Sequence, residues 1–261
     1  MDQPNIISTK LLILTMTNHD PAGTDQTTLM LNTLNVHLYR NDRKTEDLYG
    51  LNLLQNLIQG HPQLPFTGAA MRPYCLIHVI NDILVNKREK IIEFGCGVST
   101  VLLARLIKLN DLKASIISIE HIEGWGMEIN RKLAQEGLQD IAKVIHVPLG
   151  KCELAVEDNE WYLTDILERE LKDLHFDMVI VDGPPAWQAS KGMSRYPAFP
   201  FIASSLSERF SIYLDDANRP GERAVLQGWM KNYGMTFNIS GASFAYYYNG
   251  EAYFTEPMTQ F

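Results

Sequence analysis

The sequence has few cysteines, no excess of positive charge and no long apolar run, and each absence excludes a class of protein. Three cysteines in 261 residues, with no CxxC pair, are too few for a disulfide framework and predict a reducing cytoplasm. A formal net charge of −8 disfavours a nucleic-acid partner, whose phosphates attract Lys and Arg. The apolar run at residues 11–14 is far shorter than the roughly 20 residues of a membrane span, so we expect a strand there and no membrane association.

The composition is that of a globular protein that builds its own core. Hydrophobic residues make up 46% of the chain and charged residues 21%, and the seven histidines show no HxxxH or HExxH spacing that would predict a zinc site. We divide the chain into an N-terminal extension, residues 1–62, and a ligand-binding domain, residues 63–261. The extension could cover the active site or pair with a second subunit as a homodimer.

From residue 90 onward, short apolar runs alternate with longer amphipathic stretches. This rhythm is typical of an α/β, Rossmann-like, doubly wound and mostly parallel sheet, here of seven strands. Asn249-Gly250 lies between aromatic runs and predicts the turn of a C-terminal antiparallel hairpin. The remaining strands are predicted over residues 90–94, 115–120, 142–147, 176–182 and 211–215. Helices are predicted over residues 45–58, 99–108, 124–136, 161–173, 196–210 and 222–233.

The most informative segment runs from a strand through a Gly-x-Gly turn directly into a helix. Gly95 permits the tight turn, and Gly97 lets the backbone approach a ligand without a Cβ in the way. Ser99 or Thr100 can cap the helix, whose N-terminus offers unpaired N–H groups. A lone Gly-x-Gly is a weak signal, because many strand-to-helix turns carry glycine for geometry alone.

Two carboxylates make the segment more specific. Glu93 ends the strand before the glycines, where it could accept a hydrogen bond from an amino group of a ligand but would repel a pyrophosphate. Thr100 occupies the position of the third glycine in the dinucleotide fingerprint. Glu120 ends the next strand, where an acid takes the ribose hydroxyls of an adenosine ligand.

These motifs carry a resemblance to a known family. The run EFGCGVST at residues 93–100, with SIE at 118–120 and FDMVIVDGPP at 176–185, resembles the motifs of class I S-adenosylmethionine-dependent methyltransferases. The pieces WY, RYPA and LDDANRPGE also match the skeleton of a bacterial methyltransferase family. The resemblance implies that S-adenosylmethionine is the cofactor and that it contacts Thr67, Gly68, Glu93, Gly95, Gly97, Ser99, Thr100, Glu120, His121 and Asp182.

Three acids follow the fourth and fifth predicted strands. Asp182, Asp215 and Asp216 would converge beside the cofactor, and a hydrated Mg²⁺ is a natural occupant of such a cluster. The layout also resembles metal-dependent O-methyltransferases of the catechol and macrolide-sugar kind. Those catechol enzymes have a lysine base where this chain has Pro185, so the base is unassigned, with Lys191 and the aspartates as candidates.

Other interpretations of these acids stay open. Asp215-Asp216 could form a turn or a helix cap, and both can bind a metal together only if the chain leaves the sheet between them. The loop after the fourth strand overhangs the site, so Trp187, Arg195 and Tyr196 are candidate acceptor contacts.

The sequence thus predicts transfer of a methyl group to a small-molecule acceptor, with O-methylation and catalysis by Asp182, Asp215 and Lys191 as the leading hypothesis. Two alternatives are a nicotinamide-dependent oxidoreductase on a similar sheet and a non-catalytic scaffold domain.

Overall fold

The structure, a computed structural model, describes residues 26–258 and divides the chain into two compact units. Residues 1–44 form the first unit and residues 45–261 the second, and helix α2 (Gln26–Leu53) crosses the division. The division lies before residue 62 because Leu54 and Leu57 are buried in the core of the larger unit. The strand expected at residues 11–14 lies outside the described residues.

The second unit contains the seven-stranded sheet that the sequence predicts. The first five strands in spatial order run parallel, the sixth runs antiparallel to them, and the seventh pairs antiparallel with the sixth, which confirms the mostly parallel sheet with a C-terminal hairpin. In spatial order the strands are β3 (Ala142–His146), β2 (Ser115–Glu120), β1 (Lys90–Phe94), β6 (Phe176–Val181), β7 (Leu206–Leu214), β9 (Phe244–Asn249) and β8 (Asn238–Ser240).

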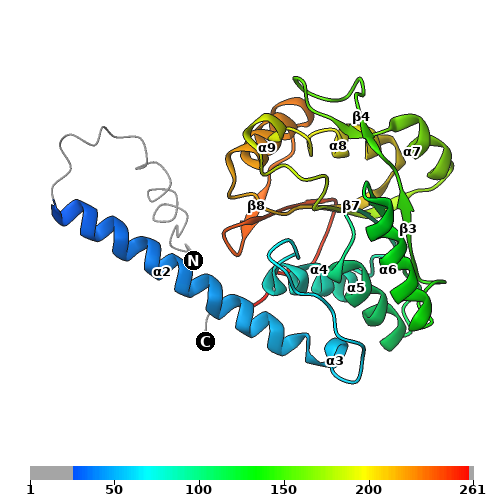
Figure 1. Ribbon diagram of the computed structural model, residues 1–261, viewed down its shortest axis with the longest axis horizontal. Helices are drawn as coiled ribbons and strands as arrows, with labels where there is room; N and C mark the ends of the chain where they lie inside the picture. Colours follow the sequence, from blue (N-terminus) through cyan, green and yellow to red (C-terminus); the bar gives the residue numbers. More distant parts are fainter. Residues whose placement is uncertain (1–25, 259–261) are drawn as a thin grey trace. The chain divides into compact units, whose positions relative to one another are not determined.

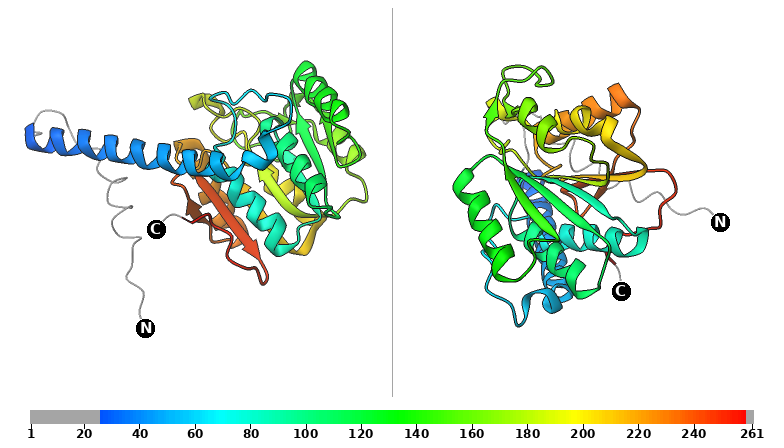
Figure 2. Two further views of the ribbon diagram at one scale, coloured as in Figure 1. Left: turned by 90° about the horizontal axis from the view of Figure 1, so that it is seen from below. Right: turned by 90° about the vertical axis from the view of Figure 1, so that its right-hand side faces the viewer.

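Helices cover both faces of the sheet (Figures 1 and 2). Alternate strand residues pack into two separate apolar cores on opposite faces of the sheet. Ile91 and Met178 face the first core, and Ile92 and Val179 face the second. Helices α3 (Gln55–Ile58), α4 (Pro73–Asn86), α5 (Val98–Leu109) and α6 (Glu123–Gln135) border the first core. Helices α7 (Thr164–Glu170), α8 (Ala198–Ile202) and α9 (Pro220–Tyr233) border the second. Two short 3₁₀ segments, η2 (Ala189–Lys191) and η3 (Ala203–Ser205), complete the helical elements among residues 26–258.

The helix predicted over residues 161–173 is wrong at its start. Trp161 and Tyr162 form strand β5 (Trp161–Tyr162), which pairs antiparallel with β4 (Leu149–Gly150), and the helix begins only at Thr164. Both aromatic rings are fully buried against Phe94, so their packing rather than helical spacing decides their conformation.

The helix predicted over residues 196–210 is also too long. Strand β7 begins at Leu206, five residues before the predicted start, and its first half is solvent-exposed or half-buried. An exposed strand segment needs no apolar run, so the sequence pattern missed it.

The turn of the C-terminal hairpin lies elsewhere than predicted. It is formed by residues 241–243 between β8 and β9, with Gly241 at a φ of +54°. Asn249 is instead the last residue of β9, and Gly250, which follows the strand, has a φ of +79°. Among residues 26–258, no helix combines the length and hydropathy that crossing a bilayer requires.

Candidate active site

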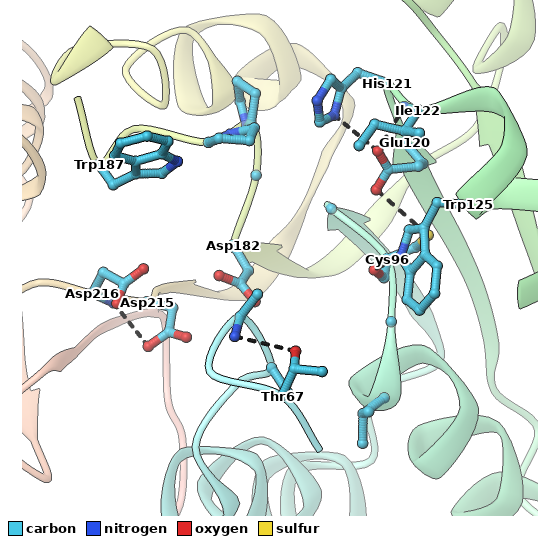
Figure 3. Close-up of a pocket in the computed structure, with 18 of the residues that line it drawn as sticks. Thr67, Cys96, Glu120, His121, Ile122, Trp125, Asp182, Trp187, Asp215 and Asp216 are labelled. Carbon is cyan, nitrogen blue, oxygen red and sulfur yellow. Dashed lines mark hydrogen bonds and ion pairs between the residues drawn. The ribbon is translucent and has the colours of Figure 1, made fainter. Parts of the chain in front are cut away.

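A cavity of about 310 Å³ opens at the carboxyl ends of β1, β2, β6 and β7 (Figure 3). This is the crevice where the strand order of a doubly wound sheet reverses, and where such sheets bind ligands. The structure brings most of the predicted site residues to its wall. They are Thr67, Gly68, Gly95, Gly97, Glu120, His121, Asp182, Trp187, Arg195, Asp215 and Asp216.

The two glycines of the loop after β1 have different physical roles. Gly95 has a φ of +97°, and a Cβ there would come within 3.1 Å of the backbone nitrogen of Gly183. Gly97 has an extended backbone, and a Cβ added to it would meet no atom within 4 Å. Gly95 is therefore required by the fold, whereas Gly97 keeps open the space at the cavity wall.

Glu93 lies beneath this loop and not in the cavity. Its fully buried carboxylate accepts hydrogen bonds from Ser99 (2.5 Å), Thr100 (2.5 Å) and Ser118 (2.6 Å). Burial raises the pKa of Glu93, and the three hydroxyl donors oppose that rise. The Thr100 hydroxyl oxygen also accepts the N–H of Gly97 at 3.1 Å, so Glu93 fixes the loop through Thr100. The helix N-cap is Gly97, two residues before Ser99 and three before Thr100, the predicted caps.

Glu120 lines the cavity, and some of the acceptor positions of its carboxylate already have donors. One carboxylate oxygen accepts the N–H of Ile122 at 2.8 Å and lies 2.8 Å from Nδ1 of His121. The other lies 3.6 Å from the thiol of Cys96. Burial raises the pKa of Glu120, but the donors from His121 and Ile122 outweigh it and the net pKa is lowered. Glu120 is therefore an ionised acceptor at neutral pH.

The three predicted acids come together at the other end of the cavity. Carboxylate oxygens of Asp182, Asp215 and Asp216 lie within 4.8 Å of one another. The chain leaves the sheet after Leu214, and Asp216 takes a φ of +59°, so both consecutive aspartates face the same place. The geometric condition for joint ligation of a cation by these residues is met.

Two arginines supply positive charge to this acid cluster. Arg195 is almost fully buried; its guanidinium lies 3.5 Å from Asp182 and 3.3 Å from Asp216, and it donates to the backbone carbonyl of Asp182 at 2.7 Å. Arg219 lies 2.8 Å from Asp216. Glu222 is buried next to both arginines, at 3.5 and 3.7 Å.

The arginines do not fully offset the repulsion among the acids. Burial and the neighbouring carboxylate of Asp215 raise the pKa of Asp182 well above its ordinary range, although Arg195 opposes the rise. Burial and the carboxylate of Asp216 raise the pKa of Asp215 to about 6. The cluster therefore favours any further positive charge that reaches it.

Five predicted site residues do not line the cavity. Glu93, Ser99 and Thr100 form the network under the loop, as described above. Lys191 lies half-buried in η2, away from the cavity wall. Tyr196 packs against Gly228 on α9, where its hydroxyl accepts a hydrogen bond from Asn232.

The wall also contains residues that were not predicted from the sequence, and Trp125, Tyr162 and Arg219 have the largest side chains among them. The indole N–H of Trp125 donates to the carbonyl of Cys96 at 2.9 Å, which joins α6 to the glycine loop. Trp125 lies in the first turn of α6, five residues after Glu120, and this closeness to Glu120 along the chain was the available signal in the sequence. Tyr162 belongs to the short β5 strand, and the signal for it in the sequence was the WY piece of the family resemblance.

Comparison with solved structures identifies the fold. A methyltransferase from Podospora anserina, PaMTH1, solved with S-adenosylhomocysteine, is 14% identical, with a TM-score of 0.51 over 88% of this chain and 98% of its own. Cofactor-bound Rv0187 from MTB is 14% identical, with a TM-score of 0.50 over 95% of this chain and 98% of its own. A Staphylococcus aureus protein assigned as a caffeoyl-CoA O-methyltransferase is 14% identical, with a TM-score of 0.50 over 84% of this chain and 98% of its own.

The chain therefore has the Rossmann-like fold of the class I methyltransferases. No protein-family model matches the sequence, and the search of curated proteins finds no relative. At these identities the likeness shows the fold alone, so the activity has to be argued from the site.

Proposed function

We propose that this protein is an S-adenosylmethionine-dependent methyltransferase that acts on a small-molecule acceptor, with a hydroxyl as the methylated group. The observation that carries the proposal is one cavity with an open glycine loop and an ionised acid at one end and a cluster of three carboxylates at the other. The likeness in fold to a methyltransferase solved with S-adenosylhomocysteine supports the same cofactor.

The glycine end suits an adenosyl ligand better than a dinucleotide. Glu120 keeps acceptor capacity beyond its bonds to Ile122 and His121, which suits the two hydroxyl donors of a ribose. Thr100 stands where a dinucleotide site has its third glycine, and its hydroxyl is committed to Glu93. The proposal therefore disfavours the nicotinamide-dependent alternative.

The acid cluster suits a divalent cation. When ionised, Asp182, Asp215, Asp216 and Glu222 carry four negative charges against two positive charges on Arg195 and Arg219, which leaves two in excess. We propose that Asp182, Asp215 and Asp216 hold Mg²⁺, whose preferred ligands are carboxylate oxygens. When bound, Mg²⁺ lowers the pKa of an acceptor hydroxyl.

The chain's own residues contribute mainly by orientation. The glycine loop and Glu120 fix the adenosyl end, the acid cluster fixes the acceptor, and holding the two in line can supply roughly 7–11 kcal/mol of the barrier. Because Lys191 is not at the cavity wall, we propose that one of the three aspartates receives the acceptor proton. Trp187, which is 70% exposed at the wall, is the proposed acceptor contact from the overhanging loop.

The test is a turnover assay with purified protein, S-adenosylmethionine and a panel of phenols, sugars and carboxylic acids. We expect S-adenosylhomocysteine to accumulate with at least one hydroxyl acceptor and to stop accumulating in EDTA. Undiminished turnover in EDTA would remove the metal from the proposal. Thermal stabilisation by NAD but not by S-adenosylhomocysteine would favour the oxidoreductase, and stabilisation by neither would favour the scaffold.

We further propose a cytoplasmic homodimer. Three unpaired cysteines suit a reducing compartment. In the first unit, α2 exposes large apolar side chains at Leu29, Met30, Leu31, Leu34, Val36, Leu38 and Tyr39, a surface that a second copy could cover. Light scattering is expected to give twice the chain mass, and to give a single chain mass for the double variant Leu34→Glu, Leu38→Glu.

A further inference from the structure

The hydroxyl of Tyr162 is a buried polar group that the fold leaves without a partner. Tyr162 is fully buried, and its hydroxyl oxygen has no hydrogen-bond partner among residues 26–258. Other buried tyrosines are satisfied: Tyr213 donates to Asp82 and Tyr74 donates to the carbonyl of Pro257, both at 3.0 Å. Burying a hydroxyl without a partner is unfavourable, so the exception at Tyr162 calls for a physical reason.

The position of this hydroxyl links it to the cavity. A Cβ added to Gly183 would come within 2.7 Å of the Tyr162 hydroxyl and within 2.9 Å of the backbone of Gly95. The hydroxyl therefore lies where the glycine turns after β1 and β6 meet, and Tyr162, Gly95 and Gly183 all line the cavity.

The ring of Tyr162 cannot turn this hydroxyl towards another partner. Its backbone pairs with Leu149 in the β4–β5 ribbon. Its ring stacks on Phe94 with centroids 6.0 Å apart and meets Trp161 edge to face at 5.6 Å. A fixed donor beside the wall of a ligand cavity is a feature of a binding site.

We infer that Tyr162 is a ligand-binding residue whose hydroxyl donates a hydrogen bond to the adenosyl ligand held between the two glycine turns. The inference rests on the proposed function for the identity of that ligand. The donor is a neutral phenol, because burial raises the pKa of Tyr162 well above its ordinary value. It therefore requires an oxygen or nitrogen acceptor, and adenosine carries both.

The test is the variant Tyr162→Phe, which removes the hydroxyl and keeps the ring. We expect its dissociation constant for S-adenosylhomocysteine, measured by calorimetry, to rise about tenfold, the size of one hydrogen bond. We expect the melting temperature of the ligand-free variant to equal or exceed that of the wild type, because no bond within the protein is lost.

The matched control is Tyr213→Phe, which removes an equally buried hydroxyl that is bonded to Asp82 and lies outside the cavity wall. It should lower the melting temperature and leave the dissociation constant unchanged. Unchanged affinity in Tyr162→Phe, or a fall in its ligand-free melting temperature like that of the control, overturns the inference. A wild-type protein that binds no S-adenosylhomocysteine refutes the proposed function itself, and this inference with it.

Discussion

The carboxylates that line the two ends of the cavity have pKa shifts of opposite direction. At the glycine end, Glu93 is surrounded by three hydroxyl donors, and Glu120 is bonded by a backbone N–H and by His121. At the other end, Asp182, Asp215 and Asp216 lie together, and Arg195 is near both Asp182 and Asp216. The pKa of Glu120 is accordingly lowered, whereas the pKa of Asp182 and that of Asp215 are raised; the pKa of Glu93, buried beneath the cavity, is raised by its burial.

This difference indicates that the glycine end recognises the ligand and that the acid end takes part in the reaction. At the glycine end, Glu120 already has donors from Ile122 and His121, so this end selects a ligand by shape and by the remaining acceptor capacity of Glu120. At the acid end, neighbouring carboxylates repel one another and raise the pKa of Asp182 and Asp215, so this end favours a cation and a polarised acceptor. Substitutions at the two ends should therefore affect different steps: affinity for the adenosyl ligand at one end, and turnover at the other.

The largest expected effect is on turnover. Asp215→Asn keeps the shape of the side chain but removes a charge from the acid cluster, so kcat is expected to fall roughly hundredfold or more. Affinity for S-adenosylhomocysteine should stay within about threefold of the wild type, because the glycine end is intact. Steady-state kinetics and calorimetry measure the two quantities. A loss of affinity as large as the loss of kcat would place Asp215 in the adenosyl pocket and contradict the separate roles of the two ends.

The second effect is on affinity. Glu120→Gln replaces an ionised acceptor, and a hydrogen bond to a charged group is worth about 1.5–3 kcal/mol, so affinity for S-adenosylhomocysteine should fall about 10–150-fold. Glu123→Gln is the matched control, because it removes the same charge from an exposed residue three positions along. If the two variants lose affinity equally, a general charge effect and not a ribose contact would explain the result.

The third prediction sharpens the roles of the glycines. Gly97→Ala adds a Cβ into open space at the cavity wall, so affinity should fall about tenfold while the melting temperature stays near the wild-type value. Gly183→Ala places a Cβ 2.9 Å from the backbone of Gly95, so it should lower the melting temperature. Loss of stability in Gly97→Ala with unchanged affinity would contradict the role of Gly97 as an opening for the ligand.

The smallest expected effect is stabilisation by Mg²⁺. A cation at ten times its dissociation constant adds about 1.4 kcal/mol to the free energy of unfolding, which raises the melting temperature by roughly 3–5 °C in a chain of this size. Differential scanning calorimetry should show the rise in the wild type and not in Asp215→Asn. The same rise in both proteins would mean that the cation binds elsewhere.

The parts of the fold that the sequence predicts are those governed by local rules. The buried strand at residues 90–94, the glycine turn and the acid ending the next strand follow one another within the chain, and the structure has them at the predicted places. The convergence of Asp182 with Asp215 was predictable because the carboxyl ends of neighbouring parallel strands share one edge of the sheet.

What the sequence could not predict depends on partners far away along the chain. Arg195, a candidate acceptor contact, lines the cavity as predicted, but its ion pairs with Asp182 and Asp216, 13 and 21 residues away, were not predicted. Trp161 and Tyr162 fit a helical pattern and form a strand instead, because they pack on Phe94. The three hydroxyl donors to Glu93, a candidate ligand contact, were not predicted, and they lie 6, 7 and 25 residues away.

Isothermal titration of the purified wild-type protein with S-adenosylhomocysteine addresses the central claim most directly. We expect saturable binding of one ligand per chain, with no competing heat from NAD. An absence of binding at millimolar ligand, in protein that melts cooperatively, would contradict the assignment of the glycine loop and Glu120 to an adenosyl ligand.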